Sequence, residues 1–315
     1  MSRAFVFPGQ GSQAVGMGSS LAAESAAARE VFAAVDEALG EPLSRLMRDG
    51  PAESLTLTAN AQPALMAVSI AAVRTLEAET GRPLTALADV VAGHSLGEYS
   101  ALTAAGTFDV ATAARLLRLR GEAMQAAVGP ADGAMAAVLG VAVEALESVV
   151  AEASTEGVVA IANDNAEGQV VISGSAAAVA RAGALAKAAG AKRVVELAVS
   201  APFHCELMRP AAERMAEALA AVQLVDPTVP LVANVSAAPV KTVAAVQAGL
   251  VDQVCARVRW RETMAYMAAA GVGEVVEAGA GKVLAAMAKR GVPGARVVSL
   301  QSMDDVRDFA AALQG

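Results

Sequence analysis

The sequence is poor in the residues that metal sites and disulfide frameworks use. Its 315 residues include two cysteines and two histidines. Cys205 and Cys255 have no repeated or metal-type spacing, so we expect no metal site, and two thiols fit a reducing cytoplasm. Because histidine is so scarce, any chemistry that needs an imidazole has to use His94 or His204.

Excess positive charge and long apolar runs are also missing. The net charge of −8 argues against a partner made of nucleic acid, whose phosphates need clustered Lys and Arg. The apolar start of MSRAFVFPGQG ends at Pro8, and no other segment offers about 18 consecutive apolar residues. We therefore expect a chain that binds neither nucleic acid nor membrane.

The composition and the hydrophobic pattern favour an α/β fold. Aromatic residues make up 3% of a chain that is 55% hydrophobic, which is typical of small-residue helices packed on a sheet. Buried strands are predicted at 3–7 and 86–93, and shorter ones near 229–235, 273–277 and 295–299. Helical segments alternate with them, as a mainly parallel sheet requires.

The pattern changes between residues 129 and 197. Here the order is strand, helix, two strands, helix and strand, which is the ferredoxin-like βαββαβ unit and can form its own sheet. We therefore expect a core made of residues 1–128 and 198–315, with residues 129–197 as an inserted subdomain.

The pentapeptide Gly93-His94-Ser95-Leu96-Gly97 matches G-x-S-x-G. In that motif a sharp turn between strand and helix lifts a serine hydroxyl above the sheet, and glycines avoid clashes in the turn. A simple glycine-bounded turn with an N-capping serine is the alternative. The strand before Ser95 and the helix after it favour the nucleophile.

A serine hydroxyl becomes a good nucleophile when a base takes its proton. His94 adjoins Ser95, so its side chain should leave the turn in another direction. His204, in SAPFHCELM, has the serine-then-histidine order of α/β hydrolases and lies in a loop before a helix. A surface or capping histidine is the alternative. Cys205 is a rival nucleophile, but an inert buried thiol fits it better.

One arginine breaks the pattern of the helix ATAARLLRLRGEAMQAAV. At 100° per residue, Arg120 falls on its apolar stripe. That stripe otherwise consists of Ala113, Leu116, Leu117 and Met124. A guanidinium on such a face needs an anion, and its planar fork suits a carboxylate. The anion is either an internal Asp or Glu, or a substrate with a free carboxylate.

Five segments together resemble one family. They are FPGQGSQ at 7–13, GHSLGEYSAL at 93–102, RLRGEAMQ at 118–125, NDNAEGQVVISG at 163–174 and SAPFHCELM at 200–208. The chain resembles the malonyl-CoA:acyl carrier protein transacylases of bacterial fatty acid synthesis, from the first strand to beyond residue 280. The resemblance implies a hydrolase-like α/β core with a ferredoxin-like insertion. It also implies a cytoplasmic monomer that uses no cofactor, with malonyl-CoA as substrate and acyl carrier protein as partner.

The resemblance assigns roles to the site residues. Ser95 would take malonyl as an ester, and His204 would act first as base and then as acid, in a Ser-His dyad without an acidic third member. Malonyl would pass by a ping-pong mechanism from coenzyme A to Ser95 and then to the phosphopantetheine thiol of the carrier. Arg120 would bind the malonyl carboxylate.

Three further residues take roles from the resemblance. The backbone N–H groups of Gln10 and Leu96 would form the oxyanion hole, and the glycines around Gln10 already allow a close backbone approach to a ligand. Gln253 would orient the histidine through its main-chain carbonyl.

The carrier protein of this pathway is acidic, so an acidic enzyme needs a local basic surface to bind it. Lys187, Lys192 and Arg193 in the inserted subdomain are the candidates for carrier docking. A solvated charge cluster is the alternative.

Three other functions remain open on sequence alone. The first is an acyltransferase that serves a polyketide synthase in trans, with the same chemistry and another carrier. The second is a serine hydrolase, in which Asp164 would supply the acid that orients His204. The third is a binding module that kept the fold without catalysis.

Overall fold

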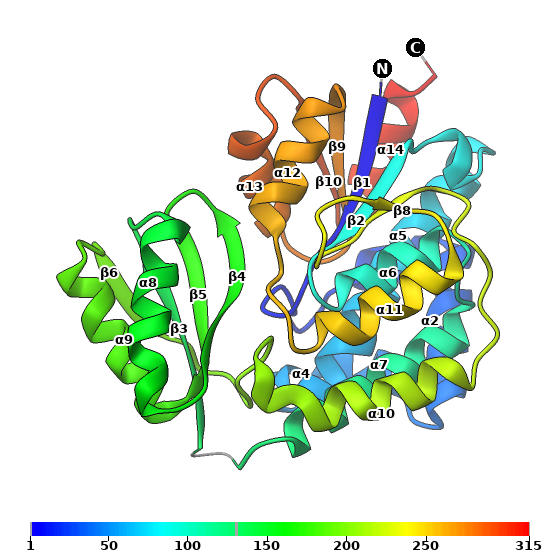
Figure 1. The fold of residues 1–315 in the computed structure, drawn as a ribbon. Coiled ribbons are helices and arrows are strands. Elements are labelled where there is room, and N and C mark those ends of the chain that lie inside the picture. The colour runs from blue at the N-terminus through cyan, green and yellow to red at the C-terminus, as the bar shows by residue number, and fades with distance from the viewer. Residues whose placement is uncertain (1, 130–131, 315) are drawn as a thin grey trace.

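The computed structural model describes residues 2–129 and 132–314, and within them the strands form two sheets (Figure 1). Residues 130 and 131, inside the predicted insertion, lie outside the described residues. The larger sheet has the order β10-β9-β1-β2-β7-β8 and is parallel except for the pair β7 and β8. Its strands are β1 (Ser2–Phe7), β2 (Val90–Gly93), β7 (Leu231–Val232), β8 (Pro239–Val240), β9 (Val272–Ala278) and β10 (Arg296–Leu300).

Helices cover both faces of this sheet because side chains of its strands alternate between two cores. Phe5 and Phe7 of β1 enter one core, whereas Ala4 and Val6 enter the other. The smaller core lies under α12 (Trp260–Ala269) and α13 (Val283–Gly291). The larger core surrounds α5 (Thr58–Thr80), which is apolar on nearly all sides and therefore buried.

The larger core is closed by helices from all along the chain. They are α1 (Ser19–Glu24), α2 (Ala26–Leu39), α3 (Leu43–Asp49), α4 (Ala52–Thr56), α6 (Gly97–Ala104), α7 (Val110–Ala126), α10 (Arg209–Ala220), α11 (Val243–Gln253) and α14 (Met303–Ala312). Among the residues that the structure describes, none of the helices is both long and apolar enough to cross a membrane.

The second sheet is built by the segment that the sequence sets apart. Its elements are β3 (Gly133–Leu139), α8 (Val143–Ala153), β4 (Val159–Ala166), β5 (Gln169–Ser175), α9 (Ala176–Ala188) and β6 (Arg193–Glu196). The strands pair antiparallel in the order β4-β5-β3-β6. One face packs on α8 and α9, and apolar side chains of the other face, Met135 among them, join the larger core.

The second sheet is joined to the core along β4, the strand nearest the larger sheet in Figure 1. The N–H of Asp164 donates to the carbonyl of Val258 at 2.9 Å, and the N–H of Val258 donates to the carbonyl of Ala162 at 2.8 Å. Val258 lies two residues before the start of α12. These two bonds fix the second sheet beside the carboxyl ends of the parallel strands, where α/β proteins place their ligands.

Candidate active site

The turn around Ser95 joins β2 to α6. Ser95 has a left-handed backbone with φ of 53°, which is unfavourable for a residue with a side chain. A Cβ atom at Gly93 would lie 1.8 Å from the carbonyl oxygen of Gly97, and one at Gly97 would lie 2.2 Å from that of Phe7. Both positions therefore require glycine, and the strand, strained turn and helix expected from the motif are present.

The hydroxyl of Ser95 lies beside the imidazole of His204. Ser95 Oγ is 2.8 Å from His204 Nε2, and His204 Nδ1 is 2.8 Å from the main-chain oxygen of Gln253. Because a carbonyl only accepts, Nδ1 carries the proton, which leaves Nε2 to accept the hydrogen of the serine. Burial, helped by the charge of Arg120, lowers the pKa of His204 to about 3. The imidazole is thus neutral and able to take a proton.

The rival groups named from the sequence have other partners. His94 Nε2 lies 2.8 Å from Asn165 Oδ1, and its ring packs edge-on against Trp260. The buried thiol of Cys205 bonds the carbonyl of Pro202. Both oxygens of Asp164 accept hydrogen bonds from Arg261 at 3.0 and 3.1 Å, so this carboxylate does not orient His204 as a hydrolase acid would.

Arg120 is almost completely buried, with 1% of its surface exposed, and is directed at Ser95. Its Nη2 donates to Ser95 Oγ at 3.2 Å and to Gln253 Oε1 at 2.8 Å, and its Nη1 donates to Gln62 Oε1 at 2.9 Å. The guanidinium also lies 5.8 Å from the ring centre of Tyr99.

No carboxylate among residues 2–129 and 132–314 forms an ion pair with Arg120, and its Nε is buried without a hydrogen-bond partner. Of the two anions that the sequence leaves open, an internal ion pair is therefore not present in the described chain. A buried cation held only by neutral side chains retains donors for an incoming anion.

Asn234, which was not predicted from the sequence, holds the main chain of the turn through its side chain. Asn234 Oδ1 accepts the N–H of Ser95 at 2.8 Å, and Asn234 Nδ2 donates to the carbonyl of Gly93 at 2.7 Å. The N–H of Ser95 is therefore occupied. Gln10 and Leu96 both line the cavity, and their N–H groups have no acceptor within the described ranges.

Two more buried groups were missed. Gln62 binds Arg120 from α5, and Glu98, in the first turn of α6, accepts from Gln253 Nε2 at 2.5 Å. Burial raises the pKa of Glu98 to about 7. The sequence does contain a signal for Glu98. The rest of GEYSALTA has no charged residue, and a helix that is apolar on all sides is buried throughout, so the one charge in this helix is expected to be buried.

A cavity of about 350 Å³ opens over these groups. The core contributes Gln10, Ser95, Leu96, Arg120 and His204 to its wall. The second sheet and its connections contribute Met135, Asn163 and residues 197–199. The site is therefore shared between both sheets, with an apolar wall opposite the polar groups, and it can hold a small acyl chain against the serine.

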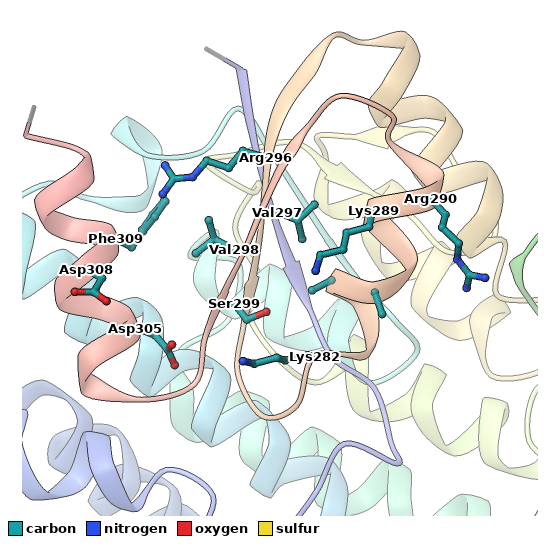
Figure 2. A pocket seen from close by; sticks show the side chains of 12 residues that line it. Lys282, Lys289, Arg290, Arg296, Val297, Val298, Ser299, Asp305, Asp308 and Phe309 are labelled. Atoms are coloured by element: carbon teal, nitrogen blue, oxygen red, sulfur yellow. The ribbon is translucent and has the colours of Figure 1, made fainter.

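Two features lie apart from this cavity. The exposed Lys187, Lys192 and Arg193 lie at the end of α9 and the start of β6, on the side of the second sheet farthest from the larger sheet in Figure 1. A larger cavity of about 690 Å³ lies along β10, between α13 and α14 (Figure 2). Its wall mixes cations such as Lys282 with Asp305 and contains none of the expected site residues.

The comparison with known families decides the assignment. A model of the acyl transferase domain matches residues 4–311. The chain belongs to the acyl transferase family. It is therefore an acyltransferase, and the resemblance found in the five sequence segments is confirmed.

Individual known proteins are similar over nearly all of the chain. Malonyl CoA-acyl carrier protein transacylase of Bacillus subtilis strain 168 is 46% identical over 288 residues, which is 91% of this chain and 89% of that protein. The crystal structure of an acyl-carrier-protein S-malonyltransferase from Bartonella henselae matches with 49% identity and a TM-score of 0.97, covering 100% of both chains.

A second solved structure is a complex. It holds a type II PKS acyl-carrier protein with its malonyl-transacylase. This chain matches it with 39% identity and a TM-score of 0.95, covering 99% of this chain and 100% of that one.

Proposed function

We propose that the protein transfers malonyl from malonyl-CoA to the phosphopantetheine thiol of an acyl carrier protein, through an ester on Ser95. The observation that carries this proposal is the buried guanidinium of Arg120, 3.2 Å from Ser95 Oγ and without a carboxylate partner in the described chain. An acyl group that ends in a carboxylate supplies the missing anion. The names of the Bacillus and Bartonella relatives support the choice of malonyl and of the carrier.

In the first half-reaction Ser95 Oγ attacks the thioester carbonyl while His204 Nε2 takes the hydroxyl proton. The carbonyl oxygen becomes negative in the tetrahedral intermediate and accepts bonds from the N–H groups of Gln10 and Leu96. As the carbon–sulfur bond breaks, His204 returns the proton to the coenzyme A sulfur. The products are the Ser95 ester and the free thiol.

The second half-reaction reverses these steps with another thiol. The carrier thiol gives its proton to His204 and attacks the ester carbonyl, and the proton then passes to Ser95 Oγ as the ester bond breaks. The two thiols are chemically alike, so the enzyme has to exclude water rather than drive the exchange. His204 needs no acidic partner in this scheme, because the carbonyl of Gln253 holds its tautomer.

Arg120 gives the transfer its selectivity. Its fork can donate two parallel hydrogen bonds to the malonyl carboxylate. An acetyl group would leave the buried cation without an anion, which is costly. We therefore expect malonyl to be strongly preferred over acetyl.

We infer a division of the chain into a hydrolase-like core of residues 1–128 and 198–315 and a ferredoxin-like insertion of residues 129–197. The order β4-β5-β3-β6 with two helices on one face supports the ferredoxin-like description. The turn at Ser95 after a parallel strand supports the hydrolase-like one.

A polyketide carrier is the second candidate acceptor, because one of the similar solved structures contains a type II PKS acyl-carrier protein. The chemistry at Ser95 is the same for either carrier. A competition assay with equal concentrations of a fatty acid carrier and a polyketide carrier distinguishes them by the ratio of malonylated products.

Intact-mass measurement after incubation with malonyl-CoA tests the main proposal. We expect one added malonyl group in the wild type and none in Ser95→Ala. Acetyl-CoA should label the wild type far more weakly, and addition of a carrier protein should remove the malonyl group from Ser95. Labelling that persists in Ser95→Ala would contradict the assignment of the nucleophile.

A further inference from the structure

Glu98 is a buried carboxylate that the transfer scheme leaves without a role. It lies three residues after Ser95, on the first turn of α6, and 1% of its surface is exposed. Its Oε2 accepts from Gln253 Nε2 at 2.5 Å and, more weakly, from the N–H of Asn234 at 3.4 Å. No arginine, lysine or histidine within the described ranges forms an ion pair with it. Burying such a group is costly, so its contacts call for an explanation.

Glu98 and the main-chain oxygen of Ser95 together determine which way the carboxamide of Gln253 faces. Gln253 Nε2 donates to Glu98 Oε2 and, at 3.0 Å, to the main-chain oxygen of Ser95. A carbonyl oxygen only accepts, so the NH2 end of the amide has to face the main-chain oxygen of Ser95, and Glu98 Oε2 accepts from the same nitrogen. The oxygen end then faces Arg120 and accepts from its Nη2 at 2.8 Å.

The opposite orientation of this amide would disturb Arg120. Two NH groups would then face each other, because both the amide nitrogen and the guanidinium can only donate. Arg120 would lose one of its acceptors and move away from Ser95 Oγ. Gln62 would remain the acceptor for Nη1, so the cation would stay buried but point elsewhere.

We propose that Glu98 is a positioning residue: by fixing the orientation of the Gln253 carboxamide, it holds Arg120 beside Ser95 and sets the preference for acyl groups that end in a carboxylate. This inference rests on the proposed function, because it concerns the acyl group that Ser95 receives. Glu98 does not occupy the guanidinium of Arg120, since the amide of Gln253 lies between them. A direct ion pair would compete with the substrate carboxylate.

The geometry separates this role from a general effect on the dyad. His204 is held by the main-chain oxygen of Gln253, whereas Glu98 acts on the side chain of that residue. Loss of Glu98 should therefore impair malonyl transfer while leaving the base in place. Acetyl has no carboxylate for Arg120 to bind, so acetyl transfer should change much less than malonyl transfer.

The test compares Glu98→Ala and Glu98→Gln with the wild type. Acylation of Ser95 is followed by quenched-flow intact mass with malonyl-CoA and, separately, with acetyl-CoA. Glu98→Ala should lower kcat/KM for malonyl about 10- to 100-fold and change that for acetyl less than about 3-fold, the loss expected when one fixed polar contact goes. Glu98→Gln keeps an oxygen that accepts from Gln253 Nε2, so it should retain the malonyl preference to within a few-fold.

A second variant tests the same contact in case Glu98→Ala does not fold. Gln253→Met removes the carboxamide but keeps the main-chain oxygen, and it should show the same selective loss of malonyl transfer. Added to Gln253→Met, Glu98→Ala should cause no further loss, because both act through one contact. Equal losses for malonyl and acetyl, or an unchanged ratio in Glu98→Ala, would overturn the inference. Failure of the wild type to label on Ser95 would instead refute the proposed function.

Discussion

Ser95 Oγ and His204 Nε2 are 2.8 Å apart, and both residues have left-handed backbones, with φ of 53° and 60°. Such conformations cost about 1 to 3 kcal/mol each and persist where the surrounding structure determines them. Around Ser95 the turn is fixed by Asn234 and by the absence of side chains at Gly93 and Gly97. The strain therefore lies at the two residues that have to meet, and it holds them ready before any substrate binds.

Replacing His204 should slow acylation without weakening substrate binding. In His204→Ala the hydroxyl of Ser95 loses its base, and we expect the rate of malonylation to fall about 10²- to 10⁴-fold. The dissociation constant for malonyl-CoA should change little, because His204 contacts the reacting oxygen rather than the carboxylate. Single-turnover intact mass gives the rate, and His94→Gln serves as the control. Equal losses in both variants would argue against His204 as the base.

Replacing Arg120 should change selectivity more than rate. Arg120→Lys keeps a charge but loses the planar fork, so kcat/KM for malonyl should fall about 10- to 100-fold, and Arg120→Ala should fall further. Transfer of acetyl should be unchanged or improved, because the cation no longer stands unpaired beside it. Parallel assays with the two thioesters measure the ratio. A constant ratio across the series would remove Arg120 from acyl selection.

Gly93→Ala should unfold the turn or the whole protein. The new Cβ would lie 1.8 Å from the oxygen of Gly97, and main-chain atoms cannot yield that far without breaking β2 or α6. Gly249→Ala is the matched control, since its Cβ would meet only Val235 at an ordinary 3.9 Å inside α11. That control should be neutral or stabilising by up to about 1 kcal/mol. Urea unfolding curves compare the two.

Glu277 should make stability fall as the pH rises. Burial raises its pKa from the ordinary 4.5 to about 7, although its oxygens accept from the N–H groups of Leu284 and Ala285. The folded state thus binds a proton that the unfolded state has released between pH 4.5 and 7. In that window its contribution falls by up to about 1.4 kcal/mol per pH unit.

Glu277→Gln removes this titration. The difference in unfolding free energy between variant and wild type should therefore shift in favour of the variant from pH 4.5 to 7 and level off above. Urea unfolding at four pH values measures it. The contribution of His204 to stability changes with pH in the opposite direction, because its lowered pKa makes the folded state less stable as the pH falls below 6.5. This contribution is the same in both proteins and cancels in the difference. A pH-independent difference would show that the Glu277 pKa is not raised.

Charge reversal at Lys187, Lys192 and Arg193 tests the proposed docking surface. If an acidic carrier binds there, the triple change to Glu should raise the KM for carrier several-fold and leave that for malonyl-CoA unaltered. Lys241→Glu, an exposed change between β8 and α11, is the control. The cluster lies near the start of β6, and none of its three residues lines the cavity. An unaltered KM for carrier would show that the cluster is solvated surface without a role in docking.

The sequence was enough to find the residues that a local pattern or a known motif marks. The strand and helix around G-x-S-x-G are visible in periodicity, and the order of Ser95 and His204 follows a known topology. Arg120 stood out because one charge on an apolar stripe violates the pattern of its helix, and the structure places it inside. The alternation of elements from 133 to 196 was likewise readable, and only the ends of strands and helices shifted.

Two of the residues that were missed, Gln62 and Asn234, carry no such violation. Gln62 follows a stretch of polar residues at the start of α5, so its position resembles an ordinary exposed first turn. Asn234 lies in a loop after the two-residue strand β7, where asparagine is common for turn formation. Their burial follows from the packing of α5, α7 and α11 around the turn, which is set by contacts between distant segments and not by local pattern.

The acceptor that orients His204 belongs to the main chain of Gln253. No amino-acid replacement at that position deletes the oxygen. The tautomer of His204 therefore depends on the path of the main chain at the end of α11 and not on the side chain of residue 253. Evolutionary drift or laboratory redesign at residue 253 can therefore alter which acyl groups are accepted while the proton-transfer pair survives. In the proposed mechanism, the main chain of this one residue orients the base, whereas its side chain contributes to the choice of acyl group.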